Sequence, residues 1–176
     1  SARLAPVRQG ARRIFRFVTS WADLERGDPE LAAPGRSRFD AAHVALIGTV
    51  RPDGSPRISP VEPYLLEGQL VIGVMRSAKA DDLAREARCT IHSVVTKPDG
   101  GEPEFKVSGR VVVTSDPRIV SAEAGWWAGR PREVATVYAI DIDEAVSVTS
   151  DIQRGRIRIV RWRPSAGSTV TERDYP

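Results

Sequence analysis

The sequence predicts a mainly β domain with short helices, an α+β chain built on an antiparallel β-barrel. Three observations lead to this fold class. Short runs rich in valine and isoleucine alternate with tight turn signals. The first connections have hairpin length, which requires antiparallel pairing. The chain has 176 residues, 41% of them hydrophobic, which is enough for one domain with a core of its own.

Four helices are expected around the strands. Ser20 followed by Asp23 has the pattern of a capping box, and Pro29 suits the first turn of a second helix. A third helix over 77–87 begins after a capping serine. A fourth, over 116–129, opens with Asp-Pro and closes at a glycine.

Seven strands are expected, and one of them is unusual. The strand 56–66 carries prolines at 60 and 63, and proline cannot donate to a β-ladder, so this strand belongs at an edge or a bulge. Bulged edges are often where a sheet opens to a ligand. The predicted strands are 43–50, 56–66, 69–75, 89–95, 104–115, 133–150 and 155–164.

We expect residues 1–18 to form a basic N-terminal arm before the domain at 19–176. The chain has 23 arginines, three lysines and a net charge of +3. The arm suits a solvated tail or a nucleic-acid contact, but only Phe15 and Phe17 could stack beside its arginines, which disfavours nucleic acid as a partner. No apolar run has membrane-spanning length. The single cysteine, Cys89, fits a reducing compartment, so we expect a cytoplasmic protein without a membrane partner.

The clearest candidate site is the stretch "VMRSAKADDL". A strand ends at Met75, and Arg76 and Lys79 flank Ser77 where a helix begins. Helix N-terminal amides and the positive end of the helix dipole form a site for an anion such as a phosphate. The alternative is an ordinary capped helix with surface charges. Metal-binding spacings and the common nucleotide motifs are absent from the sequence, so no metal is expected.

Arg161 is a second candidate, because it falls on the apolar face of the strand 155–164. A charge there needs a partner. The alternatives are an anionic ligand and an internal salt bridge to Asp141, Asp143 or Glu104.

The stretch from Val44 to Val113 resembles the flavin-binding split β-barrel family related to pyridoxamine 5′-phosphate oxidase. The shared pattern is an apolar strand, the hairpin "DGSP", a strand with a small polar residue beside proline, a third strand, and a short helix opened by "SAK". The resemblance implies a split barrel that forms a homodimer, with FMN held at the interface. We also expect some of the aromatic residues Trp126, Trp127, Tyr138 and Trp162 at that interface.

The resemblance also implies which residues contact the cofactor. The strand after the "DGSP" turn lies along the flavin ring and ribityl chain, the helix start reaches the phosphate, and the partner subunit contributes from the C-terminal strand. Ser59 and the prolines would then make this strand the floor for a planar ligand. The implied cofactor-binding residues are Arg57, Ile58, Ser59, Pro60, Val61, Gly73, Arg76, Ser77, Lys79, Glu104 and Arg161.

These residues predict an FMN-binding oxidoreductase with a small-molecule substrate. The cofactor carries the redox chemistry, so the catalytic residues stay unassigned. Ala78 stands where the oxidase itself often has a basic residue, and the chain lacks an Arg-x-His element near its C-terminus. Both departures argue against pyridoxamine phosphate as the substrate. The alternatives are a reductase that uses the deazaflavin coenzyme, a non-catalytic stress-type protein that holds flavin or haem, and a nucleic-acid binder.

Overall fold

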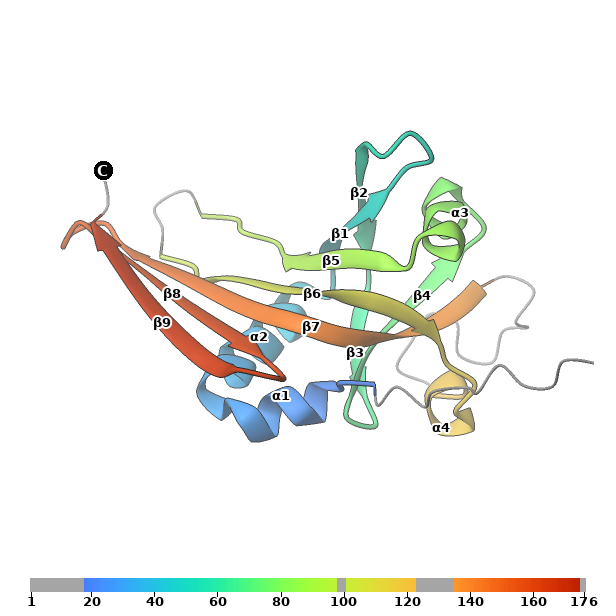
Figure 1. The fold of residues 1–176 in the computed structure, drawn as a ribbon, viewed down its shortest axis with the longest axis horizontal. Helices are drawn as coiled ribbons and strands as arrows, with labels where there is room; N and C mark the ends of the chain where they lie inside the picture. Colours follow the sequence, from blue (N-terminus) through green and yellow to red (C-terminus); the bar gives the residue numbers. More distant parts are fainter. Residues whose placement is uncertain (1–17, 98–100, 123–134, 175–176) are drawn as a thin grey trace, which may run out of the picture.

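The structure, a computed structural model, describes residues 18–97, 101–122 and 135–174, which contain four helices and nine strands (Figure 1). The helices are α1 (Trp21–Gly27), α2 (Pro29–Ala42), α3 (Ala78–Arg85) and α4 (Pro117–Val120). The strands are β1 (Ala45–Val50), β2 (Pro56–Val61), β3 (Pro63–Leu66), β4 (Gln69–Met75), β5 (Arg88–Ser93), β6 (Glu104–Val113), β7 (Ala135–Asp151), β8 (Arg156–Arg163) and β9 (Gly167–Asp174).

All strand pairs are antiparallel, and the sheet runs in the order β2-β1-β5-β6-β7-β4-β3. The first and last strands of this order, β2 and β3, follow each other in the chain at Glu62. The sheet curls back on itself without closing, because β2 pairs with β1 and β3 pairs with β4. This confirms the predicted mainly β fold with short helices and an antiparallel split barrel.

Two predictions about the strands need correction. The predicted strand 56–66 is two strands that change partner at Glu62, and the sequence analysis missed β9. The side chains of β9 are all exposed, so it has no apolar alternation by which it could be recognised. The edge position inferred from Pro60 and Pro63 is confirmed, since β2 and β3 end the main strand order.

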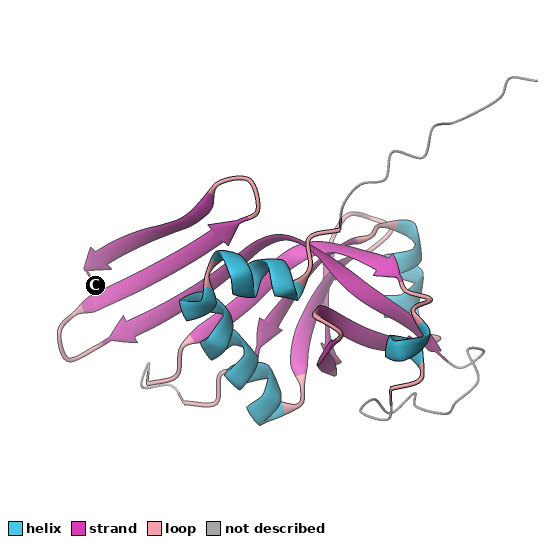
Figure 2. Cartoon of the chain, turned by 90° about the horizontal axis from the view of Figure 1, so that it is seen from below, coloured by secondary structure: helices cyan, strands magenta, loops and turns pink. Residues whose placement is uncertain are grey.

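The first two helices begin as predicted and cover one face of the sheet (Figure 2). Ser20 caps α1 in a capping box with Asp23, and Pro29 lies in the first turn of α2. Trp21 from α1, Phe39 from α2 and Phe105 from β6 meet with ring centroids 5.6 to 6.1 Å apart. Such tilted and edge-on aromatic contacts add to the stability of a buried core.

Beyond the barrel, the second half of β7 forms a ribbon with β8 and β9 (Figure 1). Trp162 of β8 packs against Gly27 of α1, where an added Cβ would come within 2.6 Å of the indole nitrogen. Trp162 and Tyr138 are both buried within the core of a single chain, so these two are not among the aromatic residues available to an interface. The helix predicted over 116–129 is wrong in its described half, because α4 ends at Val120 with Ser121 as its C-cap. Trp126 and Trp127, the other half of that predicted helix and nearly all of the arm at 1–18 lie outside the described residues.

None of the helices in the described ranges is both long enough and apolar enough to cross a membrane.

Candidate functional site

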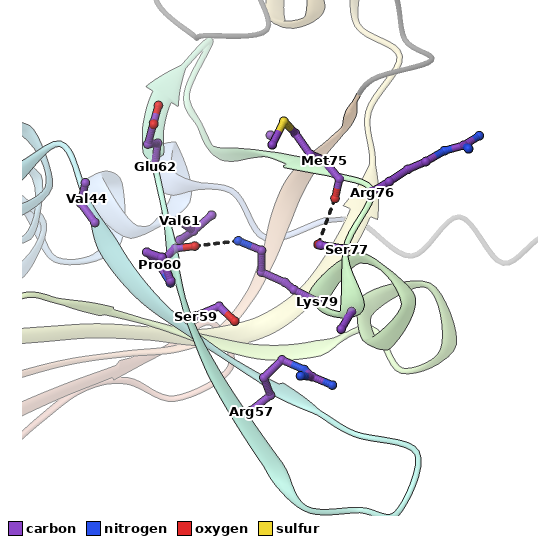
Figure 3. A pocket seen from close by; sticks show the side chains of 12 residues that line it. Val44, Arg57, Ser59, Pro60, Val61, Glu62, Met75, Arg76, Ser77 and Lys79 are labelled. Atoms are coloured by element: carbon purple, nitrogen blue, oxygen red, sulfur yellow. Dashed lines mark hydrogen bonds between the residues drawn. The ribbon is translucent and has the colours of Figure 1, made fainter.

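A pocket of about 560 Å³ lies at the open side of the barrel, between β2 and the segment that joins β4 to α3 (Figure 3). The chain opens there because β2 is an end strand, with β1 along one edge, and because β3 turns away at Glu62 to join β4. The lining residues are Val44, Arg57, Ser59, Pro60, Val61, Glu62, Gly73, Met75, Arg76, Ser77, Ala78 and Lys79.

Eight of the eleven residues predicted from the sequence line this pocket. The other three, Ile58, Glu104 and Arg161, do not. The eight come from two stretches, 57–61 and 73–79. The strands β2 and β4 that carry them are far apart in the strand order, and the curl of the barrel brings them together. They are Arg57, Ser59, Pro60, Val61, Gly73, Arg76, Ser77 and Lys79.

The start of α3 is built as the sequence predicts. Ser77 has extended backbone, and its hydroxyl accepts a hydrogen bond from the amide of Ala80 at 3.3 Å and donates to the carbonyl of Met75 at 3.0 Å. The helix dipole at this end favours an anion. Arg76 is exposed and extends away from β2, whereas Ser59 and Lys79 lie between β2 and the helix start (Figure 3).

Lys79 spans the open side of the barrel. Its Nζ donates a hydrogen bond to the backbone carbonyl of Pro60 at 2.6 Å. Partial burial lowers the pKa of Lys79 below its ordinary value. An ammonium has three N–H donors, so this contact leaves donor capacity in the pocket.

Arg57 is held from behind by a buried carboxylate. Its Nε donates to Oδ2 of Asp82 at 2.6 Å, and the hydroxyl of Thr49 donates to the same oxygen at 2.9 Å. Asp82 is only 2% exposed. The hydrogen bond from Arg57 is the main cause that holds the pKa of Asp82 below its ordinary value, so this carboxylate is ionised at neutral pH.

The end of the pocket away from Arg57 has two apolar side chains and one carboxylate. Val44, Met75 and Glu62 lie at this end, away from Arg57 along β2 (Figure 3). Glu62 accepts a hydrogen bond from the hydroxyl of Tyr64 at 2.7 Å. The pocket therefore offers a ligand both apolar surface and cationic groups.

The three predicted residues outside the pocket share the outer face of the sheet. Ile58 is 70% exposed and points away from the pocket, because neighbouring residues of a strand face opposite sides. Glu104 lies on the same outer face, 3.7 Å from the ring of His92. Arg161 pairs with Glu144 at 3.1 Å, so the ion-pair partners expected for it from the sequence are wrong.

Asp82 is the functional candidate that sequence analysis missed. In the sequence, Asp81 and Asp82 both look like exposed aspartates that complement the dipole at a helix start. Asp81 is exposed in this way, whereas Asp82 is buried. The available signal was the spacing from Lys79 to Asp82, since residues three apart share a helix face. That spacing places both side chains toward β2.

Comparison with known proteins gives structural similarity at low sequence identity. No model of a known protein family matches the chain, and no curated protein sequence does. A haem-binding protein from Mycobacterium smegmatis superposes with a TM-score of 0.57 at 19% identity, over 76% of this chain. The chain spans 59% of the length of that protein.

Two further similar structures match nearly their whole length. PhzG from Burkholderia lata 383, solved with tetrahydrophenazine-1-carboxylic acid, has a TM-score of 0.60 at 13% identity, covering 85% of this chain and 96% of PhzG. A pyridoxamine 5′-phosphate oxidase-related, FMN-binding protein from Nostoc punctiforme has a TM-score of 0.59 at 17% identity, covering 84% and 96%. The chain therefore has the split-barrel fold of these proteins.

Proposed function

We propose that this protein binds FMN in the pocket between β2 and α3 and acts as a flavin-dependent oxidoreductase on a small molecule. The observation that carries the proposal is the combination of cationic and apolar side chains in one pocket. Arg57, Lys79 and Ser77 bring two cations and a hydroxyl to the pocket, and Val44, Pro60 and Met75 bring apolar surface. A flavin mononucleotide has the matching chemistry, with a planar apolar ring and an anionic phosphate.

The residues present fit this cofactor. Lys79, Arg57 and the Ser77 hydroxyl would hold the phosphate through charge-assisted hydrogen bonds, and Arg76 would join them after a change of rotamer. Val44, Met75 and Pro60 would contact the ring and exclude water from one side of it. When bound, the flavin supplies the electron transfer, and the protein supplies positioning and electrostatics.

We further propose that the protein is a homodimer with the cofactor at the interface. The support is the outer face of the sheet, which exposes Leu46 and Ile58 beside the pocket. One row of ladder partners crosses this face from Pro60 through Leu46 to the strands that carry Glu104 and Arg161. A second copy docked on this face would bring Glu104 and Arg161 near the pocket.

Titration of the apo-protein with FMN and with riboflavin tests the proposed cofactor. We expect FMN to bind more tightly than riboflavin, because riboflavin lacks the phosphate. Equal affinity would contradict the phosphate assignment, and the binding of neither would overturn the proposal. A deazaflavin coenzyme, which also carries phosphate, is the alternative cofactor and is titrated in parallel.

A second candidate function is a non-catalytic holder of a planar ligand. The similarity to a haem-binding protein favours it. The absorption spectrum of the purified protein separates the two candidates. A flavin spectrum together with repeated turnover of an electron donor and an acceptor supports the oxidoreductase, and a haem Soret band supports the second candidate.

A further inference from the structure

We propose that Asp82 is a positioning residue, which holds the guanidinium of Arg57 in the orientation that grips a ligand phosphate. This inference rests on the proposed function, since it concerns the phosphate end of the same pocket. Asp82 does not line the pocket and would not touch the ligand. It acts through Arg57.

The geometry around Arg57 carries the proposal. Asp82 binds Nε of Arg57 at 2.6 Å and is its one hydrogen-bond partner among the residues that the structure describes. This contact uses one of the five N–H donors of a guanidinium, and the two terminal NH₂ groups lie at the far end of the planar fork. A guanidinium fixed at Nε therefore offers its terminal groups in one orientation, which is the geometry for a bidentate contact with phosphate.

The surroundings of Asp82 fix its own position. The carboxylate is buried in α3, and the hydroxyl of Thr49 on β1 donates to the oxygen that Arg57 contacts. One oxygen of Asp82, a residue of α3, thus accepts hydrogen bonds from Thr49 on β1 and from Arg57 on β2. A buried carboxylate is costly unless it is paired and hydrogen-bonded, so the arrangement favours one rotamer at each of the three residues.

The direction in which FMN affinity changes when Asp82 loses its charge distinguishes a positioning role from a simple charge effect. Asp82 is negative and lies behind a site for an anion, so removing its charge should tighten FMN binding if only Coulomb attraction matters. If Asp82 orients Arg57, the same change should weaken binding. Asp82→Asn keeps the size of the side chain and removes the charge. The two explanations therefore predict opposite changes in FMN affinity for this one variant.

The experiment is a titration of apo-protein with FMN and riboflavin for the parent, Asp82→Asn, Arg57→Ala and the double variant. We expect Asp82→Asn to weaken FMN binding about tenfold and riboflavin binding less than threefold. The loss should vanish in the Arg57→Ala background, because coupled residues are not additive. Unchanged or tighter FMN binding, an equal loss for riboflavin, or a loss that persists without Arg57 would overturn the inference.

Asp81→Asn is the matched control. It removes the same charge from the preceding position of the same helix, where the side chain is exposed. We expect its FMN affinity to equal or exceed that of the parent. A tenfold loss in Asp81→Asn would assign the effect to the helix and not to Arg57.

Two further measurements keep the inference testable. If the parent does not bind FMN, the proposed function fails, and the four proteins are titrated with inorganic pyrophosphate. A loss of pyrophosphate affinity in Asp82→Asn that vanishes in the Arg57→Ala background would then support the orienting role, and no binding by the parent would overturn it. If Asp82→Asn does not fold, NMR of the parent decides. Slow solvent exchange of the Arg57 Nε–H supports the role, and fast exchange contradicts it.

Discussion

Lys79 and Pro60 join the two sides of the open barrel, since the lysine Nζ donates to the proline carbonyl at 2.6 Å. The contact links the first turn of α3 to an end strand whose outer edge has no strand beside it in the described fold. The proposed pocket therefore has an internal brace at its centre. A ligand phosphate that binds there would share this ammonium with Pro60 or take it over.

The first prediction concerns the charge of Lys79. We expect Lys79→Ala to weaken FMN binding by about 1.5–3 kcal/mol, roughly ten- to a hundredfold, because one charge-assisted hydrogen bond is lost. Riboflavin binding should change much less. Fluorescence titration of both ligands measures the two affinities.

Lys97→Ala is the control for this variant, because Lys97 is an exposed lysine outside the pocket. It should bind FMN as the parent does. An equal loss in both lysine variants would indicate a general charge effect and not a local contact.

The second prediction is a pH dependence of FMN binding. Burial lowers the pKa of Lys79 below 10.5, so the ammonium loses its proton at a lower pH than an exposed lysine does. FMN affinity should therefore fall as the pH rises toward 10.5, whereas Arg57 stays charged throughout that range. Riboflavin has the same ring as FMN, so its affinity, measured over the same pH range, corrects for ionisation of the ring. Lys79→Arg should hold its FMN affinity over the same range.

The third prediction is a loss of stability in acid that depends on Glu102. Its carboxylate accepts from the amide and the hydroxyl of Thr96, at 2.7 and 2.9 Å, and from Arg38 at 3.1 Å. These contacts, led by the Thr96 amide, lower the pKa of Glu102 from 4.5 to about 2. A lowered pKa gives stability that is present above pH 4.5 and is lost as the pH falls from 4.5 toward 2.

Glu102→Gln should remove this part of the pH dependence. Urea unfolding at several pH values between 2 and 7 measures the effect as a slope of unfolding free energy against pH. Parallel curves for Glu102→Gln and the parent would show that Glu102 is not the titrating group.

The fourth prediction concerns the contact between α2 and the sheet at Gly35. A Cβ at this position would come within 2.4 Å of the Phe105 ring, which is buried and held by Trp21 and Phe39. Overpacking costs about 1–3 kcal/mol, whereas alanine gains about 1 kcal/mol over glycine inside a helix. Gly35→Ala should therefore lower the free energy of unfolding. Ser37→Ala, exposed on the same helix, should be neutral or slightly stabilising.

The parts of the site that could be predicted from sequence are local. The turn before β2, the prolines that mark an end strand and the cap at Ser77 each depend on a few neighbouring residues. The division of 56–66 at Glu62 could not be predicted in the same way. It depends on which strands pair with each half, and those partners lie elsewhere in the chain.

The contact between Arg57 and Asp82 was beyond prediction for the same reason. The two residues are 25 positions apart, and they meet only because the barrel curls until α3 lies against β2. β9 was missed for a different reason. Its side chains are exposed on both faces, so the alternation that identifies a half-buried strand is absent.

The last prediction concerns the proposed dimer. We expect the parent protein to sediment as a dimer at micromolar concentration and Ile58→Asp to sediment largely as a monomer. Ile58 is 70% exposed on the outer face of the sheet, which Leu46 and Glu104 share. A carboxylate buried without a partner in an interface costs more than 1.4 kcal/mol, so dimerisation should weaken more than tenfold.

Val170→Asp is the matched control, because Val170 is an exposed valine on the opposite face of the sheet, on the side of Trp162. This variant should stay a dimer. If the cofactor lies at the interface, Ile58→Asp should also bind FMN more weakly at low protein concentration and recover as the concentration rises. A monomeric parent would remove the proposed interface, and a dimeric Ile58→Asp with parent affinity would place the interface on another face.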